Sequence, residues 1–347
     1  MASEKRYQED LLNKISQLGY SILTSSDISN LRNSQQEFVL EDILFEQIKK
    51  INKDIDLNDQ DIKLIISNLK NNYKNKPNEF LRNPLQTRID YKKSGTNKNT
   101  SIKLFDYENI NNNAFHVSEE FVVIQSGGYR RADIVIFING IPLVIFELKK
   151  PNISVDKAID QLISYKDYTN NFWSFIQLFI ACNSIDAKYG TSKTGKEHYS
   201  NLSFDKNKTL DENILYLINK EMLMDVLKNF IFINKGKKIV SRPQQIRATN
   251  KTLDRLKNNK GGIIWHTQGS GKSITMFLII TKILKNFKNP KILVVTDRKD
   301  LDKQISNTLS QTMSGSLVTA NNINDLNVHL KKQDFTVMST LIHKFGD

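Results

Sequence analysis

The spacing of hydrophobic residues changes along the chain, and this change predicts where helices give way to strands. In residues 1–80 apolar side chains recur every three or four positions, at 9–18, 40–51 and 62–69, as in amphipathic helices. From Phe115 onward, short runs rich in Val, Ile and Phe predict strands at 121–125, 132–138 and 142–148. The Asn-Gly pair at 139–140 between the last two runs is typical of a tight hairpin.

Helices and strands alternate further along the chain. We expect a helix over 155–168, a strand over 175–182, surface loops over the polar residues 187–208 and helix over 210–230. After Arg242 and Pro243 the pattern predicts a helix at 244–258, a strand at 262–265, a glycine-rich loop, a helix to about 287 and a strand at 292–296. This order is typical of a parallel α/β sheet. We therefore expect two α/β domains, 1–235 (core about 115–185) and 236–347.

Composition agrees with a soluble protein of about two domains, with 39% hydrophobic and 25% charged residues. The longest apolar stretch, 134–148, is too short to span a bilayer. The N-terminus has no apolar signal core, so we expect a cytoplasmic protein. A single cysteine, Cys182, excludes an intramolecular disulfide and a multi-cysteine metal site.

The net charge of +13 favours polyanionic partners, of which nucleic acid is the commonest. A proteome rich in lysine and asparagine would produce the same surplus, as the stretch 71–76 illustrates. Charge therefore favours a nucleic acid without choosing between DNA and RNA.

Candidate chemistry in the first domain lies at Asp133, Glu147 and Lys149. Glu147 and Lys149 leave the same face of one predicted strand, and Asp133 lies on its hairpin partner. Two carboxylates can hold Mg²⁺, and a lysine can orient the water that the metal activates. An exposed strand end decorated with charges is the alternative, but both strands are otherwise apolar, and burying unpaired charges would cost several kcal/mol.

One feature of the hairpin is awkward for this site. A strict two-residue turn at 139–140 would set Ala132, not Asp133, opposite Glu147. The two carboxylates share a face only if a bulge or a longer loop adds one residue. We predict such an irregularity.

The segments 130–135, 139–143 and 147–149 resemble the PD-(D/E)xK nuclease core, and more narrowly that of the restriction subunit (HsdR) of type I restriction-modification enzymes. Ala132 stands where the motif's proline is expected, a position without a catalytic atom. The resemblance implies that Asp133 and Glu147 bind the metal and that Lys149 is catalytic. Gln161 and Tyr165, which share a helical face, match the family's Q-x-x-x-Y motif and would position the site or the DNA backbone. A polar helix face is the alternative for that pair.

The second domain carries a candidate phosphate-binding loop after an apolar run and before an apolar helix. Its glycines allow backbone N–H groups to cradle phosphates at a helix N-terminus, while Lys272 would reach the β- and γ-phosphates and Ser273 would bind Mg²⁺. The cofactor-binding residues expected here are Thr267, Gly269, Ser270, Gly271, Lys272 and Ser273. A simple glycine-rich turn is the alternative. His266 replaces the first glycine of the general pattern, which helicase-type motors relax, and we interpret it as structural.

Neighbouring segments resemble those of superfamily 2 motors. Residues 242–248 resemble the adenine-reading motif, with Gln245 as the base-recognising residue, although an ordinary helix start after proline would look the same. Residues 295–301 with Gln304 resemble a segment that meets the DNA backbone, and 340–345 resemble the next family stretch. ATP hydrolysis also needs an acidic motif and arginines from a second lobe, and no Asp-Glu-x-His or Asp-Glu-x-Asp follows Asp297. We therefore expect an incomplete RecA-like lobe, the first part of a longer polypeptide, without ATP turnover of its own.

The resemblance implies a type I restriction endonuclease subunit. It would hydrolyse phosphodiester bonds of double-stranded DNA with Mg²⁺ and couple this to ATP-dependent translocation, in partnership with DNA methyltransferase and specificity subunits. A nuclease core ahead of the motor fits type I subunits, whereas type III subunits carry it after the motor. A DNA-repair nuclease-helicase and a non-catalytic DNA-binding module with remnant carboxylates are the alternatives.

Overall fold

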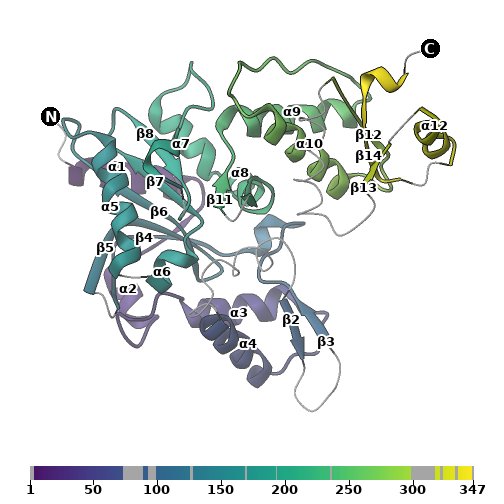
Figure 1. Ribbon diagram of the computed structural model, residues 1–347. Coiled ribbons are helices and arrows are strands. Elements are labelled where there is room, and N and C mark those ends of the chain that lie inside the picture. The colour runs from purple at the N-terminus through teal and green to yellow at the C-terminus, as the bar shows by residue number, and fades with distance from the viewer. Residues whose placement is uncertain are drawn as a thin grey trace. The chain divides into compact units, whose positions relative to one another are not determined.

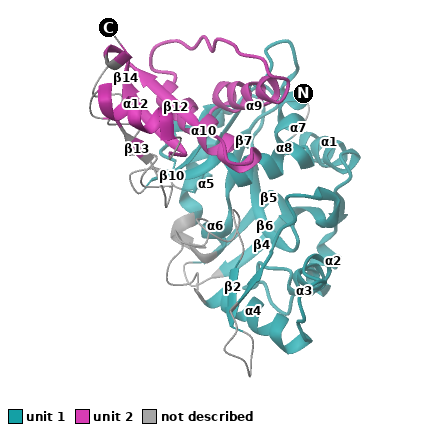
Figure 2. Ribbon diagram, turned by 90° about the vertical axis from the view of Figure 1, so that its right-hand side faces the viewer, with its two compact units in different colours: residues 1–241 teal, residues 242–347 magenta. Residues whose placement is uncertain are grey.

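The computed structural model describes residues 4–72, 89–92, 99–125, 128–168, 170–192, 194–234, 237–297, 317–320, 323–332 and 335–345. The chain divides into two compact units, residues 1–241 and 242–347 (Figures 1 and 2). Both are α/β. Within the described residues no helix combines the length and apolar character needed to cross a membrane.

The first unit is built on one mixed sheet, which contains seven strands among the described residues, in the order β1-β4-β5-β6-β7-β8-β9. Strands β4, β5 and β6 are antiparallel, whereas β1 runs parallel to β4 and β7 parallel to β6. Every residue of β6 and β7 is buried, so both faces of the sheet are covered at its centre. The strands are β1 (Ser21–Leu23), β4 (Phe115–Gln125), β5 (Gly128–Ile138), β6 (Ile141–Leu148), β7 (Leu178–Cys182), β8 (Ala187–Gly190) and β9 (Ser200–Asn201).

Helix α5 (Val155–Tyr168) packs across β5, β6 and β7, as Figure 1 shows. Its buried Ala158, Ile159 and Leu162 join Val135 and Phe179 of the sheet in one hydrophobic cluster. The sequence predicted this helix with the same bounds. The other helices of the unit are α1 (Glu4–Gln17), α2 (Ser25–Asn30), α3 (Glu41–Ile51), α4 (Asp59–Asn72), α6 (Asn170–Phe175), α7 (Leu210–Ile218) and α8 (Lys220–Asp225), with a π-helical turn at Val226–Phe230. Short hairpins β2–β3 (Ile89–Lys92, Asn99–Ile102) and β10–β11 (Ile231–Asn234, Lys237–Val240) complete it.

Two expectations for this unit were wrong in part. The predicted strand at 175–182 begins only at Leu178, because α6 continues to Phe175. The polar stretch 187–208 contains β8 and β9 as well as loops. Backbone pairing with β7 extends the sheet there, and Tyr189 supplies the anchor: its buried hydroxyl donates to the carbonyl of Ser241 at 2.7 Å.

The β5–β6 hairpin contains the predicted irregularity. Asn139 and Gly140 both have positive φ, 53° and 79°, as a tight hairpin turn requires. Ile138 pairs with Ile141, but the register shifts between Ile136 and Phe137, so that Ile136 pairs with Val144. Leu143 is the extra residue, and its carbonyl accepts the N–H of Gln177 at 2.8 Å. Beyond this bulge Ile134 pairs with Phe146, so the next residues along the two strands, Asp133 and Glu147, leave the same face of the sheet.

The second unit has a parallel sheet with three strands among the described residues, in the order β12-β14-β13. Its elements are α9 (Pro243–Lys257), α10 (Lys272–Asn286), β12 (Ile292–Thr296), β13 (Leu317–Thr319), α12 (Ile323–Lys332), β14 (Val337–Leu341) and a 3₁₀ turn at Ile342–Phe345. The motor-like segment 340–345 therefore comprises the end of β14 and this turn.

The predicted strand at 262–265 is wrong. Residues 262–265 have no regular secondary structure and form no ladder, and the side chains of Ile263 and Trp265 are 92% and 90% exposed. A strand needs a neighbour to accept its backbone hydrogen bonds, and none of the described strands pairs with this segment. Residues 298–301 and Gln304 lie outside the described residues.

Candidate active site

The β5–β6 hairpin brings the three predicted nuclease residues together. The ammonium group of Lys149 lies 2.6 Å from Oε1 of Glu147 and donates to the carbonyl of Leu148 at 2.9 Å. The carboxylate of Asp133 accepts the N–H of Leu148 at 2.6 Å. The bulge makes this arrangement attainable, because without it Asp133 and Glu147 would leave opposite faces.

Helix α5 contributes Tyr165 to the same cluster. The Tyr165 side chain is 1% exposed, and its hydroxyl donates to the carbonyl of Arg131 at 2.8 Å and lies 3.1 Å from Oε2 of Glu147. Gln161, one turn earlier, forms a side-chain hydrogen bond with Tyr165. Tyr165 thus contacts Glu147 from a buried position, whereas Gln161 is half-buried and contacts Tyr165.

Burial governs the protonation of both carboxyl groups. It raises the pKa of Glu147 to about 8, with the charge of Asp133 adding to the effect and Lys149 and Tyr165 opposing it. Burial likewise raises the pKa of Asp133 to about 6, against the lowering effects of the Leu148 N–H and of Lys149. Without a cation, Glu147 is therefore mostly protonated at neutral pH whereas Asp133 is mostly ionised, and a bound cation would displace the proton of Glu147.

The donor set fits Mg²⁺. Carboxylate oxygens are the ligands this ion prefers, and it retains several waters rather than requiring a full protein cage. Among the described residues no group of three His, Cys, Asp or Glu side chains could hold a metal by itself, so Asp133 and Glu147 would supply the protein ligands and water the rest. Glu147 is 1% exposed, and burying a carboxyl group near a second one costs free energy even with Lys149 as a partner, which a bound cation would offset.

Gln8 of α1 reaches this site although no motif marks it. It lies on the apolar side of α1 with Leu11, Leu12 and Ile15, and only 5% of it is exposed. Its amide nitrogen lies 3.2 Å from the carbonyl oxygen of Asp133. A glutamine at a core-facing position of an amphipathic helix is the one signal in the sequence that could have indicated it.

In the second unit, the glycine-rich loop lies directly before α10 and leads into its first turn. Gly269 and Gly271 have φ of 76° and 83°, and Gly271 is the N-cap. Ser270 Oγ donates to the carbonyl of Thr267 at 2.7 Å, and the ammonium group of Lys272 donates to the same carbonyl at 2.9 Å. A Cβ at Gly269 would meet nothing within 4 Å. The open loop and the helix N-terminus fit a phosphate group, with Ser273 in the first turn of α10.

Gln245 connects α9 to this loop. The side chain is 3% exposed; its oxygen accepts the N–H of Arg242 at 2.8 Å, and its nitrogen lies 3.3 Å from the carbonyls of Ser270 and Gly271. These contacts connect the loop to α9. The predicted base-recognising role of Gln245 remains a prediction.

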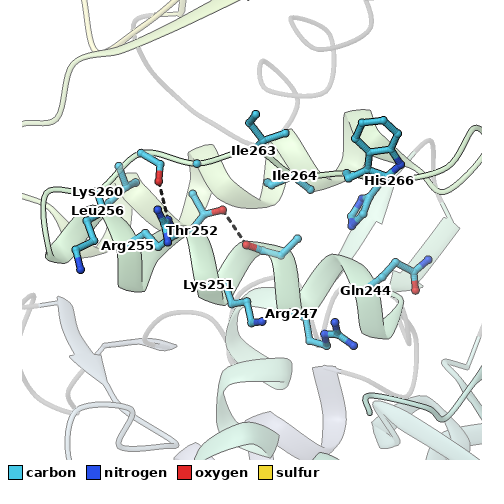
Figure 3. A pocket seen from close by; sticks show the side chains of 14 residues that line it. Gln244, Arg247, Lys251, Thr252, Arg255, Leu256, Lys260, Ile263, Ile264 and His266 are labelled. Atoms are coloured by element: carbon cyan, nitrogen blue, oxygen red, sulfur yellow. Dashed lines mark hydrogen bonds between the residues drawn. The ribbon is translucent and has the colours of Figure 1, made fainter. Parts of the chain in front are cut away.

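A groove runs beside the loop, between α9 and residues 260–266 (Figure 3). Thr252 Oγ1 donates to the carbonyl of Ala248 at 2.8 Å, and Arg255 Nε donates to that of Gly261 at 2.6 Å. The cationic side chains in its lining are Arg247, Lys251, Arg255 and Lys260. His266 lines the groove, but residues 267–273 do not, so the groove is distinct from the predicted phosphate site.

Two family models match the chain in succession. "Type I restriction enzyme R protein N terminus" matches residues 1–198, and "SWI2/SNF2 ATPase" matches residues 244–347. The first covers more than half of the chain, and the chain therefore belongs to the family of type I restriction enzyme R proteins.

Individual relatives agree with this family. The MjaIXP endonuclease subunit of Methanocaldococcus jannaschii is 29% identical over 96% of this chain and 36% of its own length. The type I restriction enzyme HindI endonuclease subunit of Haemophilus influenzae is 34% identical over 64% of this chain and 24% of its own length. The chain thus spans about a third or less of these relatives. A solved HsdR fragment from Vibrio vulnificus YJ016 gives a TM-score of only 0.25 at 14% identity over 66% of this chain and 42% of that one, too low to carry an argument.

Proposed function

We propose that residues 1–241 hydrolyse phosphodiester bonds of double-stranded DNA with Mg²⁺, as the nuclease of a type I restriction enzyme. The bulge at Leu143 carries this proposal, because it brings Asp133 and Glu147 to the same face of the sheet while Lys149 lies 2.6 Å from the Glu147 carboxylate. Two carboxylates and a lysine on one hairpin form the minimal set for metal-assisted attack of water on phosphate.

Each residue of the site has its own role in the proposed hydrolysis. A magnesium ion, when bound, polarises the phosphoryl oxygen and acidifies a water. Asp133 and Glu147 would hold that ion. Lys149, 17% exposed at its side chain, is placed to orient the attacking water and to stabilise negative charge on the phosphate. Tyr165 would hold Glu147 in place through its hydroxyl, Gln161 would orient Tyr165, and the surrounding apolar strands would keep bulk water away.

The second unit would bind ATP with Mg²⁺ through Lys272 and Ser273 at the glycine-rich loop, with Gln245 beside it. In a longer restriction subunit this binding would drive translocation along DNA. We place DNA methyltransferase and specificity subunits as partners in the cytoplasm, and the net charge of +13 suits the DNA substrate.

The test uses the full-length restriction subunit assembled with its partner subunits on unmethylated plasmid, with ATP turnover and DNA cleavage recorded together. Glu147→Ala should abolish cleavage and leave ATPase activity, whereas Lys272→Ala should abolish both. Lys149→Ala should behave like Glu147→Ala. Lys150→Ala, which removes the adjacent exposed ammonium group, is the matched control and should cut normally. Persistent cutting by Glu147→Ala would show that the cleavage chemistry lies elsewhere.

A further inference from the structure

The ladder between β4 and β5 opens beside Asp133. Glu119 pairs with Ile134 and Phe121 with Ala132, but no pair forms at the position between them, Glu120 and Asp133. Glu120 has φ of 51°, a left-handed conformation that costs free energy for a residue other than glycine. Strain of this kind persists where surrounding contacts enforce it, and here it lies directly opposite a proposed metal ligand.

Gln8 occupies this opening. Its amide nitrogen lies 3.2 Å from the Asp133 carbonyl oxygen, 3.2 Å from Oε1 of Glu120 and 3.3 Å from Oε2 of Glu119. Successive side chains of a strand normally point to opposite faces. Both glutamates reach the same amide because the left-handed residue breaks that alternation. The two N–H groups of this one amide thus serve three acceptors of β4 and β5, which must share them.

Glu120 extends the network toward the reacting groups. Its Oε2 lies 2.7 Å from Nε of Arg131. The carbonyl of Arg131 accepts the Tyr165 hydroxyl, which also contacts Glu147. Two routes therefore converge on the proposed metal site, one through the Asp133 main chain and one through Arg131 and Tyr165.

The chemistry of an amide suits this place. A glutamine donates to carboxylates and to a carbonyl without carrying a charge, so it holds the strands together without neutralising Asp133 as a lysine would. A side chain without a donor would leave the Asp133 carbonyl short of a partner in a largely buried setting.

We propose that Gln8 and Glu120 are positioning residues that hold Asp133 in the place from which it binds the divalent cation. This inference rests on the proposed function, since it presumes that Asp133 and Glu147 bind a cation. It assigns a role in the nuclease to α1, an element more than a hundred residues before the motif.

Cation affinity tests the inference without DNA or ATP. Binding of Mn²⁺ alone to the 347-residue chain is measured by calorimetry and by electron paramagnetic resonance, with thermal melting of each variant in parallel. Gln8→Leu keeps a bulky side chain at this position but removes its donors. Loss of a supporting hydrogen bond to a metal site typically costs about 10- to 100-fold in affinity, and we expect at least a tenfold rise in Kd. Gln17→Leu, at the exposed end of the same helix, is the control and should leave Kd unchanged.

Glu120→Gly separates positioning from stability. Glycine adopts a φ of 51° without strain, so this variant should melt no lower than the wild type and yet bind Mn²⁺ several-fold more weakly. A purely structural Glu120 would give the reverse, lower melting with unchanged affinity. This variant also decides the matter if Gln8→Leu does not fold.

Glu147→Gln distinguishes the two proposals. If it abolishes Mn²⁺ binding while Gln8→Leu and Glu120→Gly stay within twofold of wild type, the inference about Gln8 and Glu120 is overturned and the proposed metal site stands. If Glu147→Gln binds Mn²⁺ as the wild type does, the metal site itself is wrong, and this inference fails with it.

Discussion

The hydroxyl of Tyr165 lies 3.1 Å from Oε2 of Glu147, so a helix residue holds the carboxylate that projects from the neighbouring strand. Tyr165→Phe removes that contact and the hydrogen bond to Arg131. We expect cleavage by the assembled enzyme to fall by about 10- to 100-fold and the unit to lose about 1–3 kcal/mol of stability. Tyr189→Phe is the control, because it removes an equally buried hydrogen bond, to Ser241, far from the carboxylates in sequence. Equal loss of cleavage in both variants would contradict a specific role for Tyr165.

The raised pKa of Glu147 gives the cation-free protein a characteristic dependence on pH. A carboxyl group whose pKa is higher in the folded state, about 8 against an ordinary 4.5, stabilises the fold below pH 4.5 and loses that contribution as pH rises toward 8. Asp133 acts in the same direction between about pH 3.8 and 6.

Thermal melting in a chelator checks this dependence. Glu147→Gln cannot ionise, so its Tm minus that of the wild type should grow steadily from pH 5 to pH 8. The exposed Glu46→Gln serves as the control and should follow the wild type at every pH. A constant difference across this range would mean that Glu147 keeps its ordinary pKa.

Gly140 sets the turn on which the site depends. Its φ is 79°, and a Cβ there would lie 2.4 Å from the carbonyl oxygen of Leu40. We expect Gly140→Ala to destabilise the first unit by about 2 kcal/mol or more, from the left-handed conformation and the backbone clash together. Gly261→Ala, whose Cβ would meet nothing within 4 Å, should melt like the wild type. Denaturant titration measures both.

Experiment can distinguish two roles of Gln245 in nucleotide binding, holding the glycine-rich loop in place and recognising the adenine base. Its contacts to Arg242, Ser270 and Gly271 predict that Gln245→Ala loosens the loop and weakens ATP and GTP binding alike, by about tenfold if roughly 1.4 kcal/mol is lost. Competition titrations with both nucleotides on the full-length subunit measure this. Weakening of ATP alone would instead support recognition of the adenine base.

Much of the first unit follows from its sequence. Apolar runs locate β6 and β7 because both strands are buried at every residue, and counting residues across the hairpin predicts the bulge. The count cannot say which residue bulges, since that depends on Gln177, which comes from the segment after α6 and binds the carbonyl of Leu143.

Other features depend on partners that a local pattern does not contain. Strands β8 and β9 are short, and they form because β7 offers an edge to β8 and β8 in turn offers one to β9. The run 262–265 has strand composition but no strand beside it among the described residues. Gln8 acquires its place only when α1 meets β4 and β5.

The bulge also bears on how related sequences are interpreted. Deletion of Leu143 alone would remove the extra residue of β6 and set Ala132, not Asp133, opposite Glu147. Asp133, Glu147 and Lys149 would all still be present, yet the two carboxylates would leave opposite faces of the sheet. A sequence that retains the three motif residues therefore retains the site only if it also retains the residue count between them.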